Sequence, residues 1–378
     1  MTIVPPSAPN DTATGRARTR LRATAVVVAL FALVAASGFG RSDPAVEDAP
    51  PVTPPAASAD ASAPRIVPPD STPPIATTTT AAPGLPVVVP DPRPGDLRVD
   101  DDADVLPAGY EPEPASTVVR DVAYGTDPAQ RLDLYLPEGA GAPVLLYLHS
   151  GGWIGGDKSA IPDMVLRFVE RGYAVASVDY RLAPDDPFPA AVTDVKLAIR
   201  WLKAYAEADG TIDGGRVVLV GASSGGHLAA FAAATPGEYE PTDLDPELAA
   251  FDSTVAGVVS LVGPTDLVQL YDQRHVWARG ITSAFVGCFP CDAAQLTEPS
   301  VGAHLHPGLP PAYWAYGTED PLIDARSQAV AIAMGWAAAA GAEMSWLDLV
   351  NGAEHTLDES TVNQRALEAF VDRAVGLG

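Results

Sequence analysis

The segment 217–234 constrains the fold of this chain more than any other stretch. Residues 217–220 are apolar, and three of the four are β-branched, which is typical of a buried strand. The turn Gly221-Ala222-Ser223-Ser224-Gly225 follows, and residues 228–234 favour a helix. This order predicts a strand, a sharp turn and a helix. A serine would then stand at the edge of a sheet, beside a helix N-terminus that stabilises negative charge.

Glycine spacing separates the two serines of this turn. Only Ser223 has a glycine both two positions before it and two positions after it, at Gly221 and Gly225. Glycine at both places lets the backbone turn tightly without a Cβ clash. We therefore expect Ser223 to present its hydroxyl as a nucleophile, and Ser224 to contribute its backbone N–H.

Strand-like and helix-like segments alternate through residues 116–378, which we expect to form one folded domain. The predicted strands cover residues 118–124, 132–136, 143–148, 174–178, 216–220, 255–262, 312–316 and 344–350. The predicted helices cover residues 164–170, 192–206, 228–234, 327–340 and 361–375. Such alternation predicts an α/β fold with a mostly parallel central sheet and helices on both faces. Functional groups of such sheets lie outside the C-terminal ends of the strands.

A serine nucleophile needs a base to take its proton and an acid to orient that base. In strand–turn–helix sites, both follow the serine along the chain. His355 lies in the loop after the last predicted strand, and Asp320 stands at the C-terminal end of the strand 312–316. We therefore predict His355 as the base and Asp320 as the acid. Asp324 is typical of a helix N-cap, and Asp348 lies inside a strand.

The other histidines after the serine fit the role of base less well. His227 follows Ser223 too closely to turn back on it, so we expect His227 to be structural. His275 precedes the strand expected to carry the acid. His304 and His306 lie among prolines and could pair on a metal, but such loop histidines are usually not ligands, and we predict no metal site.

A pair of glycines follows the central strand 143–148, in His149-Ser150-Gly151-Gly152-Trp153. Consecutive glycines after a strand allow backbone N–H groups to point into a site. Two such donors, together with the N–H after the nucleophile, can hold a tetrahedral oxyanion. An ordinary turn at a strand end is the alternative interpretation, and the serine turn about seventy residues later favours the functional one.

Residues 116–378 resemble the α/β-hydrolase superfamily and, within it, the hormone-sensitive-lipase-like and bacterial feruloyl-esterase-like carboxylesterases. The segments that carry the resemblance, in the order of the family, are Leu132-Asp133-Leu134-Tyr135-Leu136-Pro137, Gly155-Gly156-Asp157-Lys158, Val178-Asp179-Tyr180-Arg181-Leu182-Ala183-Pro184, Phe188-Pro189-Ala190, residues 221–227, Gly317-Thr318-Glu319-Asp320-Pro321-Leu322 and His355.

The resemblance implies a serine hydrolase of the α/β-hydrolase fold that needs no metal or organic cofactor. In this interpretation Ser223 is the nucleophile, Asp320 the acid and His355 the base. The implied oxyanion hole is formed by backbone N–H groups of Gly151, Gly152 and Ser224. The segment that contains Tyr180 and Arg181 is expected to support the site from behind.

The chain departs from the family pattern in three places. Ser150 stands where the family usually has glycine, and Ser224 replaces a more usual alanine. Residues 264–309 match poorly and contain Trp277 and Phe285. We expect this insert to cover the site as a small lid or side wall, where acyl or alcohol preference would be set.

The first 40 residues are expected to direct export. Four arginines between positions 16 and 22 precede an apolar run over residues 23–36, which is typical of a secretory signal. An uncleaved membrane anchor is the alternative, because residues 23–40 approach the length that spans a bilayer. Either interpretation places the folded domain outside the cytoplasm, and the second would add membrane association.

Residues 41–115 have the composition of a spacer rather than of a packed domain. Proline, alanine, threonine and serine dominate, and large apolar residues are too few to offset the chain entropy of folding. We predict a disordered, Pro-rich linker. Its acidic run at residues 100–104 could hold calcium, but a solvated linker is the simpler interpretation.

Charge and cysteine content limit the partners and the compartment. The formal net charge is −25, from 23 basic and 48 acidic residues, which argues against nucleic acid as a partner because its phosphates would be repelled. The two cysteines, Cys288 and Cys291, form a Cys-x-x-Cys pair in a segment typical of a loop. In an exported chain we expect a structural disulfide, with a redox motif as the alternative.

The sequence thus predicts an exported serine carboxylesterase that acts on a small-molecule ester. Two enzymatic alternatives use the same three residues: an amidase, peptidase or formamidase, and an enzyme that removes ester groups from polysaccharide. A third alternative is a non-catalytic, hydrolase-like surface protein on a Pro-rich stalk.

Overall fold

The computed structural model describes residues 117–272, 275–357 and 361–377. The predicted export segment (residues 1–40) and linker (residues 41–115) lie outside these residues. Within the described ranges, no helix combines the length and the apolar character that crossing a bilayer requires.

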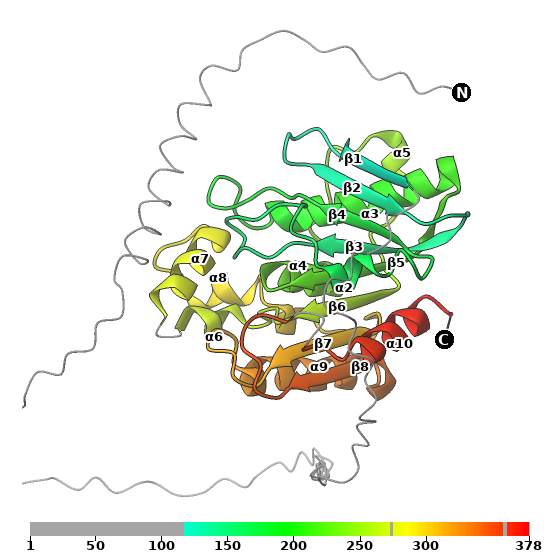
Figure 1. The fold of residues 1–378 in the computed structure, drawn as a ribbon. Coiled ribbons are helices and arrows are strands. Elements are labelled where there is room, and N and C mark those ends of the chain that lie inside the picture. Colours follow the sequence, from blue (N-terminus) through cyan, green and yellow to red (C-terminus); the bar gives the residue numbers. More distant parts are fainter. Residues whose placement is uncertain (1–116, 273–274, 358–360, 378) are drawn as a thin grey trace, which may run out of the picture. The chain divides into compact units, whose positions relative to one another are not determined.

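The described strands form one sheet in the order β1-β2-β4-β3-β5-β6-β7-β8 (Figure 1). Their bounds are β1 Thr117–Ala123, β2 Arg131–Leu136, β3 Ala142–Leu148, β4 Ala174–Val178, β5 Ile212–Ala222, β6 Gly257–Leu261, β7 Ala312–Gly317 and β8 Ser345–Val350. Strand β2 is antiparallel to β1 and β4, and all other neighbours are parallel. The prediction of a mostly parallel sheet is therefore confirmed.

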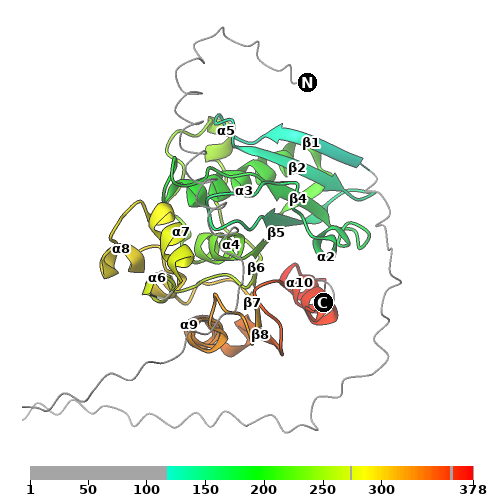
Figure 2. The same cartoon turned by 60° about the vertical axis from the view of Figure 1, so that its left-hand side comes forward.

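Helices cover both faces of this sheet, as Figure 2 shows. One face carries α3 (Ala190–Asp209), α4 (Ser224–Ala234) and α9 (Ala331–Ala340), and the other carries α2 (Asp163–Leu166) and α10 (Gln364–Ala374). Neighbouring strand residues alternate between two cores: Leu146 and Leu219 belong to the first, Leu145 and Val218 to the second. Burial on both faces explains why the central strands are continuous apolar runs.

Several observed elements differ from the predicted segments at their ends. The predicted helix 164–170 is α-helical only at α2, and the chain continues in tighter turns up to Gly172. The predicted helix 327–340 begins as a π-helical segment, Ala325–Val330, whose N-cap is Asp324 as predicted. Helix α3 is longer than predicted and ends at Asp209, and Gly210 caps it in the left-handed conformation that glycine tolerates best.

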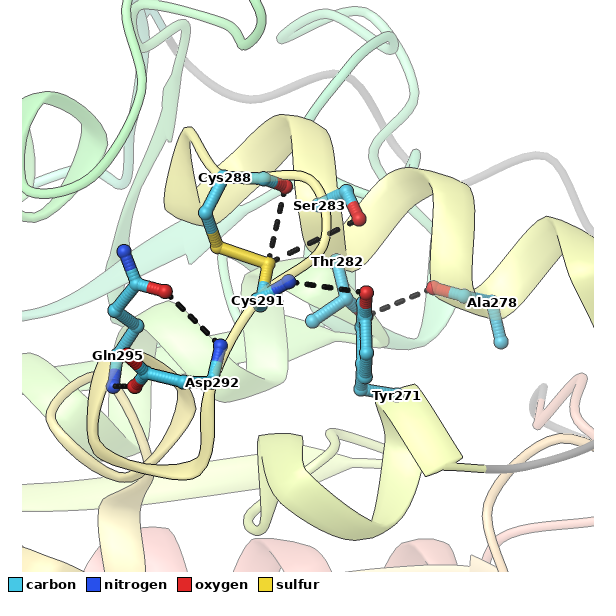
Figure 3. The surroundings of a disulfide bond; sticks show 8 residues. All are labelled: Tyr271, Ala278, Thr282, Ser283, Cys288, Cys291, Asp292 and Gln295. Atoms are coloured by element: carbon cyan, nitrogen blue, oxygen red, sulfur yellow. Dashed lines mark hydrogen bonds between the residues drawn. A yellow bond between two sulfur atoms is a disulfide. The ribbon is translucent and has the colours of Figure 1, made fainter.

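The described part of the insert at residues 264–309 contains three helices, which Figure 1 shows gathered at one side of the sheet. They are α6 (Leu267–Asp272), α7 (Val276–Val286) and α8 (Ala293–Thr297), followed by a 3₁₀ turn, Val301–His304. A disulfide joins Cys288 to Cys291 directly after α7, in agreement with the prediction (Figure 3). The backbone N–H of Cys291 donates to the hydroxyl of Tyr271, which ties the disulfide loop to α6.

Candidate active site

Ser223 occupies the tight turn between β5 and α4 in an unusual backbone conformation. Its φ is 52°, a value that costs free energy in a residue with a Cβ. Its backbone N–H donates to the carbonyl of Leu261 on β6 at 2.8 Å, which holds the turn against the neighbouring strand. The predicted strand, turn and helix are thus present, and Ser223 stands at the C-terminal edge of the sheet.

The two glycines that flank Ser223 are required by close backbone packing. A Cβ on Gly221 would lie 2.2 Å from the carbonyl oxygen of Gly225. A Cβ on Gly225 would lie 2.1 Å from the carbonyl oxygen of Leu148, the last residue of β3. The turn therefore presses directly against the end of β3, and this contact brings it beside the segment that follows β3.

We expect Gly225→Ala to lower the free energy of unfolding by at least about 2 kcal/mol, because the new methyl group can be accommodated only by moving backbone. Urea denaturation would measure the effect. The matched control is Gly280→Ala in α7, where a Cβ would meet no atom within 4 Å. That control should be neutral or stabilise the protein by up to about 1 kcal/mol. Equal stability of the two variants would contradict the steric argument.

The three residues predicted as nucleophile, base and acid lie in one hydrogen-bonded line. Ser223 Oγ is 3.0 Å from His355 Nε2, and His355 Nδ1 is 2.7 Å from Asp320 Oδ2. The three side chains come from the turn after β5, the loop after β7 and the loop after β8. β5, β7 and β8 are parallel strands of one sheet, so their C-terminal ends lie at the same edge. This explains how Ser223 and His355, which are 132 positions apart, meet.

Asp320 is buried, and its carboxylate accepts hydrogen bonds on both oxygens. Its side chain is fully buried, whereas that of His355 is 26% exposed. Its second oxygen, Oδ1, accepts the backbone N–H groups of Leu322 and Ile323 at 2.8 and 2.9 Å. Because these donors fix Oδ1, the other oxygen faces His355 Nδ1. The carboxylate therefore holds the imidazole with Nε2 toward the serine and able to accept its proton.

The predicted oxyanion segment makes a tight turn, in which backbone atoms pack closely against one another. Gly151 and Gly152 have φ values of 133° and 62°, in the region where L side chains are strained. The buried Tyr180 donates its hydroxyl to the carbonyl of His149 at 2.8 Å, and the two rings stack with centroids 4.3 Å apart. The segment beside the serine turn is thus fixed by hydrogen bonds and ring packing that precede any substrate contact.

Arg181, next to Tyr180, supports the site through a buried carboxylate. Its guanidinium and its backbone N–H both donate to Asp194 on α3, whose side chain is fully buried. Gln130 donates to the same carboxylate at 2.7 Å. This saturated arrangement fixes the turn after β4 and agrees with the expected supporting role.

The insert contacts the oxyanion segment through α7. The side chain of Ile281 lies 3.1 Å from the place that a Cβ on Gly152 would occupy, so the two residues are in contact. Phe285, one turn further along α7, stacks on Trp153 with ring centroids 4.6 Å apart. The insert therefore packs against the segment that follows β3, whereas its Trp277 remains 46% exposed.

The other residues that the sequence analysis considered, His304, His306 and Asp348, lie outside the hydrogen-bonded chain of Ser223, His355 and Asp320. His304 Nε2 lies 2.7 Å from the carbonyl of Glu298, and His306 Nδ1 accepts the N–H of Gly308. Among the described residues, no group of three or more His, Cys, Asp or Glu side chains could hold a metal ion. Asp348 accepts the hydroxyl of Tyr313 across the sheet.

Two buried polar residues, Lys196 and His227, make contacts that the sequence does not predict. Lys196 is fully buried on α3 and donates to the carbonyls of Ala232 and Thr235 at the C-terminal end of α4, where a cation is favoured. Its burial lowers its pKa to about 8. Trp153 donates its indole N–H to His227 on α4. In the sequence, the only signal for the contact of Lys196 with α4 is that a lysine occupies a core position of the predicted helix 192–206.

Comparison with curated proteins finds esterases of Mycobacterium tuberculosis. Esterase LipC is 36% identical over 152 residues, which cover 39% of this chain and 37% of LipC. Esterase LipQ is 29% identical over 267 residues, which cover 68% of this chain and 62% of LipQ. The matched part thus spans less than two thirds of either relative.

Solved structures share the fold at low sequence identity. A truncated carbohydrate esterase from gut microbiota superimposes with a TM-score of 0.57 at 21% identity, covering 69% of this chain and 97% of that chain. Esterase 2 of the Planctomycetes species Thermogutta terrifontis gives 0.55 at 22% identity, covering 70% and 93%. The family model described as BD-FAE matches residues 132–335, more than half of the chain and most of the described domain. The chain therefore belongs to the BD-FAE family and has the α/β-hydrolase fold.

Proposed function

We propose that this protein is an exported serine carboxylesterase whose nucleophile is Ser223. The observation that carries the proposal is the line from Ser223 Oγ through His355 to the buried Asp320, with contacts of 3.0 and 2.7 Å. A hydroxyl, an imidazole and a carboxylate in this order are the groups that acyl transfer needs. The esterase names of the curated relatives support the same reaction class.

The proposed reaction has two halves. Ser223 Oγ attacks the ester carbonyl while His355 Nε2 takes the hydroxyl proton, and the C=O oxygen becomes an oxyanion. His355 then gives that proton to the departing alcohol, which leaves an acyl ester on Ser223. In the second half, water takes the place of the serine hydroxyl: His355 takes a proton from it, and the resulting hydroxide attacks the acyl ester. His355 then returns the proton to Ser223 Oγ as the carboxylic acid leaves. The products are one carboxylic acid and one alcohol.

The backbone N–H groups of Gly151, Gly152 and Ser224 are proposed to stabilise the oxyanion. Gly225 packs against the end of β3, so the segment after β3 lies beside the serine turn. Ser224 is the first residue of α4, where N–H groups lack partners within the helix and favour negative charge. Donors fixed before the reaction need no reorganisation when charge develops.

Export rests on the sequence and on the disulfide. Disulfides persist in oxidising compartments, so the Cys288–Cys291 bond supports a location outside the cytoplasm. We propose that residues 1–40 direct this export and either are removed or remain as an anchor.

A substrate panel tests the proposed reaction class. The full chain would be given p-nitrophenyl acetate, butyrate and octanoate, acetylated xylan, a formyl amide and a dipeptide. We expect the short aryl esters to be hydrolysed with a kcat/KM at least about 100-fold above that of the amide and the dipeptide, because p-nitrophenoxide is a far better leaving group than an amide nitrogen. Release of acetate from xylan would extend the substrate range to polysaccharide. Cleavage of amides without ester hydrolysis would contradict the proposal.

A further inference from the structure

His227 links three parts of the molecule that meet at the candidate site. Its Nδ1 accepts the indole N–H of Trp153 at 3.2 Å, and its Nε2 lies 2.8 Å from the carbonyl oxygen of Pro299. Its backbone N–H donates to the carbonyl of Ser223 at 3.0 Å. One residue thus contacts the oxyanion segment, the nucleophile turn and the insert.

The hydrogen-bond partners of His227 determine its tautomer. A carbonyl oxygen can only accept, so Nε2 must carry the proton that points at Pro299. Nδ1 is then unprotonated and can accept from Trp153, whose indole nitrogen can only donate. Both nitrogens of the neutral ring therefore have a hydrogen-bond partner, and the two contacts require the same tautomer.

A charged His227 would not fit this position. Its side chain is fully buried among Trp153, Phe231 and Phe285, all of which are uncharged. A proton on Nδ1 would place two N–H donors against each other at the contact with Trp153. Burial accordingly lowers the pKa of His227 to about 4, and the carbonyl of Pro299 offsets only part of this effect.

Trp153 in turn determines the shape of the oxyanion segment. It directly follows Gly152, its φ is 61°, and its side chain is 1% exposed. Its carbonyl accepts the N–H of Ala183, so backbone and indole are both held. Without the bond to His227 the indole would keep its ring contacts but lose its hydrogen-bond acceptor, and the backbone that carries Gly151 and Gly152 would be held less precisely.

We propose that His227 is a positioning residue: by accepting the indole N–H of Trp153 it holds Gly151 and Gly152 in place beside Ser223. This inference rests on the proposed function, and His227 itself touches neither substrate nor the reacting atoms. Because the oxyanion forms only during the reaction, misplacing its donors lowers kcat and leaves KM nearly unchanged.

Two substitutions separate the two contacts of the ring. His227→Asn places an amide oxygen near the position of Nδ1, so it keeps an acceptor for Trp153 and loses the reach to Pro299. His227→Gln places an amide nitrogen near the position of Nε2, so it keeps the donor to Pro299 and loses the acceptor. We expect the Gln variant to lose at least about tenfold in kcat with KM within about twofold, and the Asn variant to lose less than about threefold.

Three controls distinguish positioning from a general loss of structure. Trp153→Phe removes the donor, so in that background the Asn and Gln variants should have equal kcat. His304→Gln changes another histidine of the same aromatic cluster that contacts Phe231 rather than Trp153, and it should leave kcat unchanged. The melting temperature of each variant shows whether activity merely follows the folded fraction.

The hydrogen bond itself can be observed without any activity. In ¹⁵N-labelled protein the Trp153 indole signal, identified by its loss in Trp153→Phe, should exchange slowly with solvent in the wild type and the Asn variant and faster in the Gln variant. A folded Gln variant with wild-type kcat, or equal losses in both variants that follow stability, would overturn the positioning role. If the wild type hydrolyses no ester, the proposed function fails, and a rapidly exchanging wild-type indole would overturn this inference separately.

Discussion

Ser223→Ala is expected to lower kcat/KM for p-nitrophenyl acetate by at least about 10⁴-fold, because it removes the hydroxyl that lies 3.0 Å from His355 Nε2 and that attacks the carbonyl in the proposed reaction. Removing one oxygen at a partly exposed position should leave the melting temperature within a few degrees of the wild type. Hydrolysis of the ester, followed by absorbance, and a thermal melt measure the two effects.

The neighbouring serine supplies a matched comparison. Ser224→Ala keeps the backbone N–H that the oxyanion would use and removes only a buried hydroxyl. We expect this variant to lose less than about tenfold in kcat/KM. A larger loss from Ser224→Ala than from Ser223→Ala would show that the glycine spacing had been assigned to the wrong serine.

Asp320→Asn should lower kcat by about 10³- to 10⁴-fold without unfolding the protein. The two N–H donors from Leu322 and Ile323 require an oxygen at the position of Oδ1, so the new amide nitrogen must take the position of Oδ2. It would then donate to His355 Nδ1 and drive the ring proton to Nε2. The imidazole would face Ser223 with a proton and could no longer act as a base.

The control for this substitution is Asp324→Asn. Asp324 caps the following helical segment by accepting the N–H of Ser327 at 2.7 Å, and asparagine is an equally good N-cap. Its kcat should stay within about twofold of the wild type. An Asp320→Asn enzyme with more than about a tenth of the wild-type kcat would contradict the role given to the carboxylate.

The residues of the candidate site could be located from the sequence because each follows a strand. Apolar runs at 217–220 and 312–316 identified buried strands, and a parallel sheet brings the carboxyl ends of such strands to one edge. Glycine at positions 221 and 225 then identified Ser223, and the structure explains this requirement by backbone oxygens about 2 Å from the missing Cβ atoms. Local chemistry and chain order are sufficient to predict that these residues meet at one edge of the sheet.

Contacts between side chains far apart in sequence could not be predicted in the same way. The sequence predicts a structural role for His227 because it follows Ser223 closely, but it does not indicate the partners Trp153 and Pro299, which lie 74 and 72 positions away. The arrangement of the insert could not be predicted from the sequence either, because α6 and α8 are too short to show a helical period. Such contacts depend on how loops pack, and neither propensity nor periodicity encodes that packing.

Covalent labelling of the intact protein tests the central claim most directly. A fluorophosphonate reacts with a serine only when a base activates its hydroxyl and donors hold the phosphoryl oxygen. After digestion, mass spectrometry should find one adduct, on the peptide that contains Ser223, and none in the Ser223→Ala variant. An enzyme that hydrolyses esters but carries its adduct on another residue, or remains unlabelled, would contradict the account.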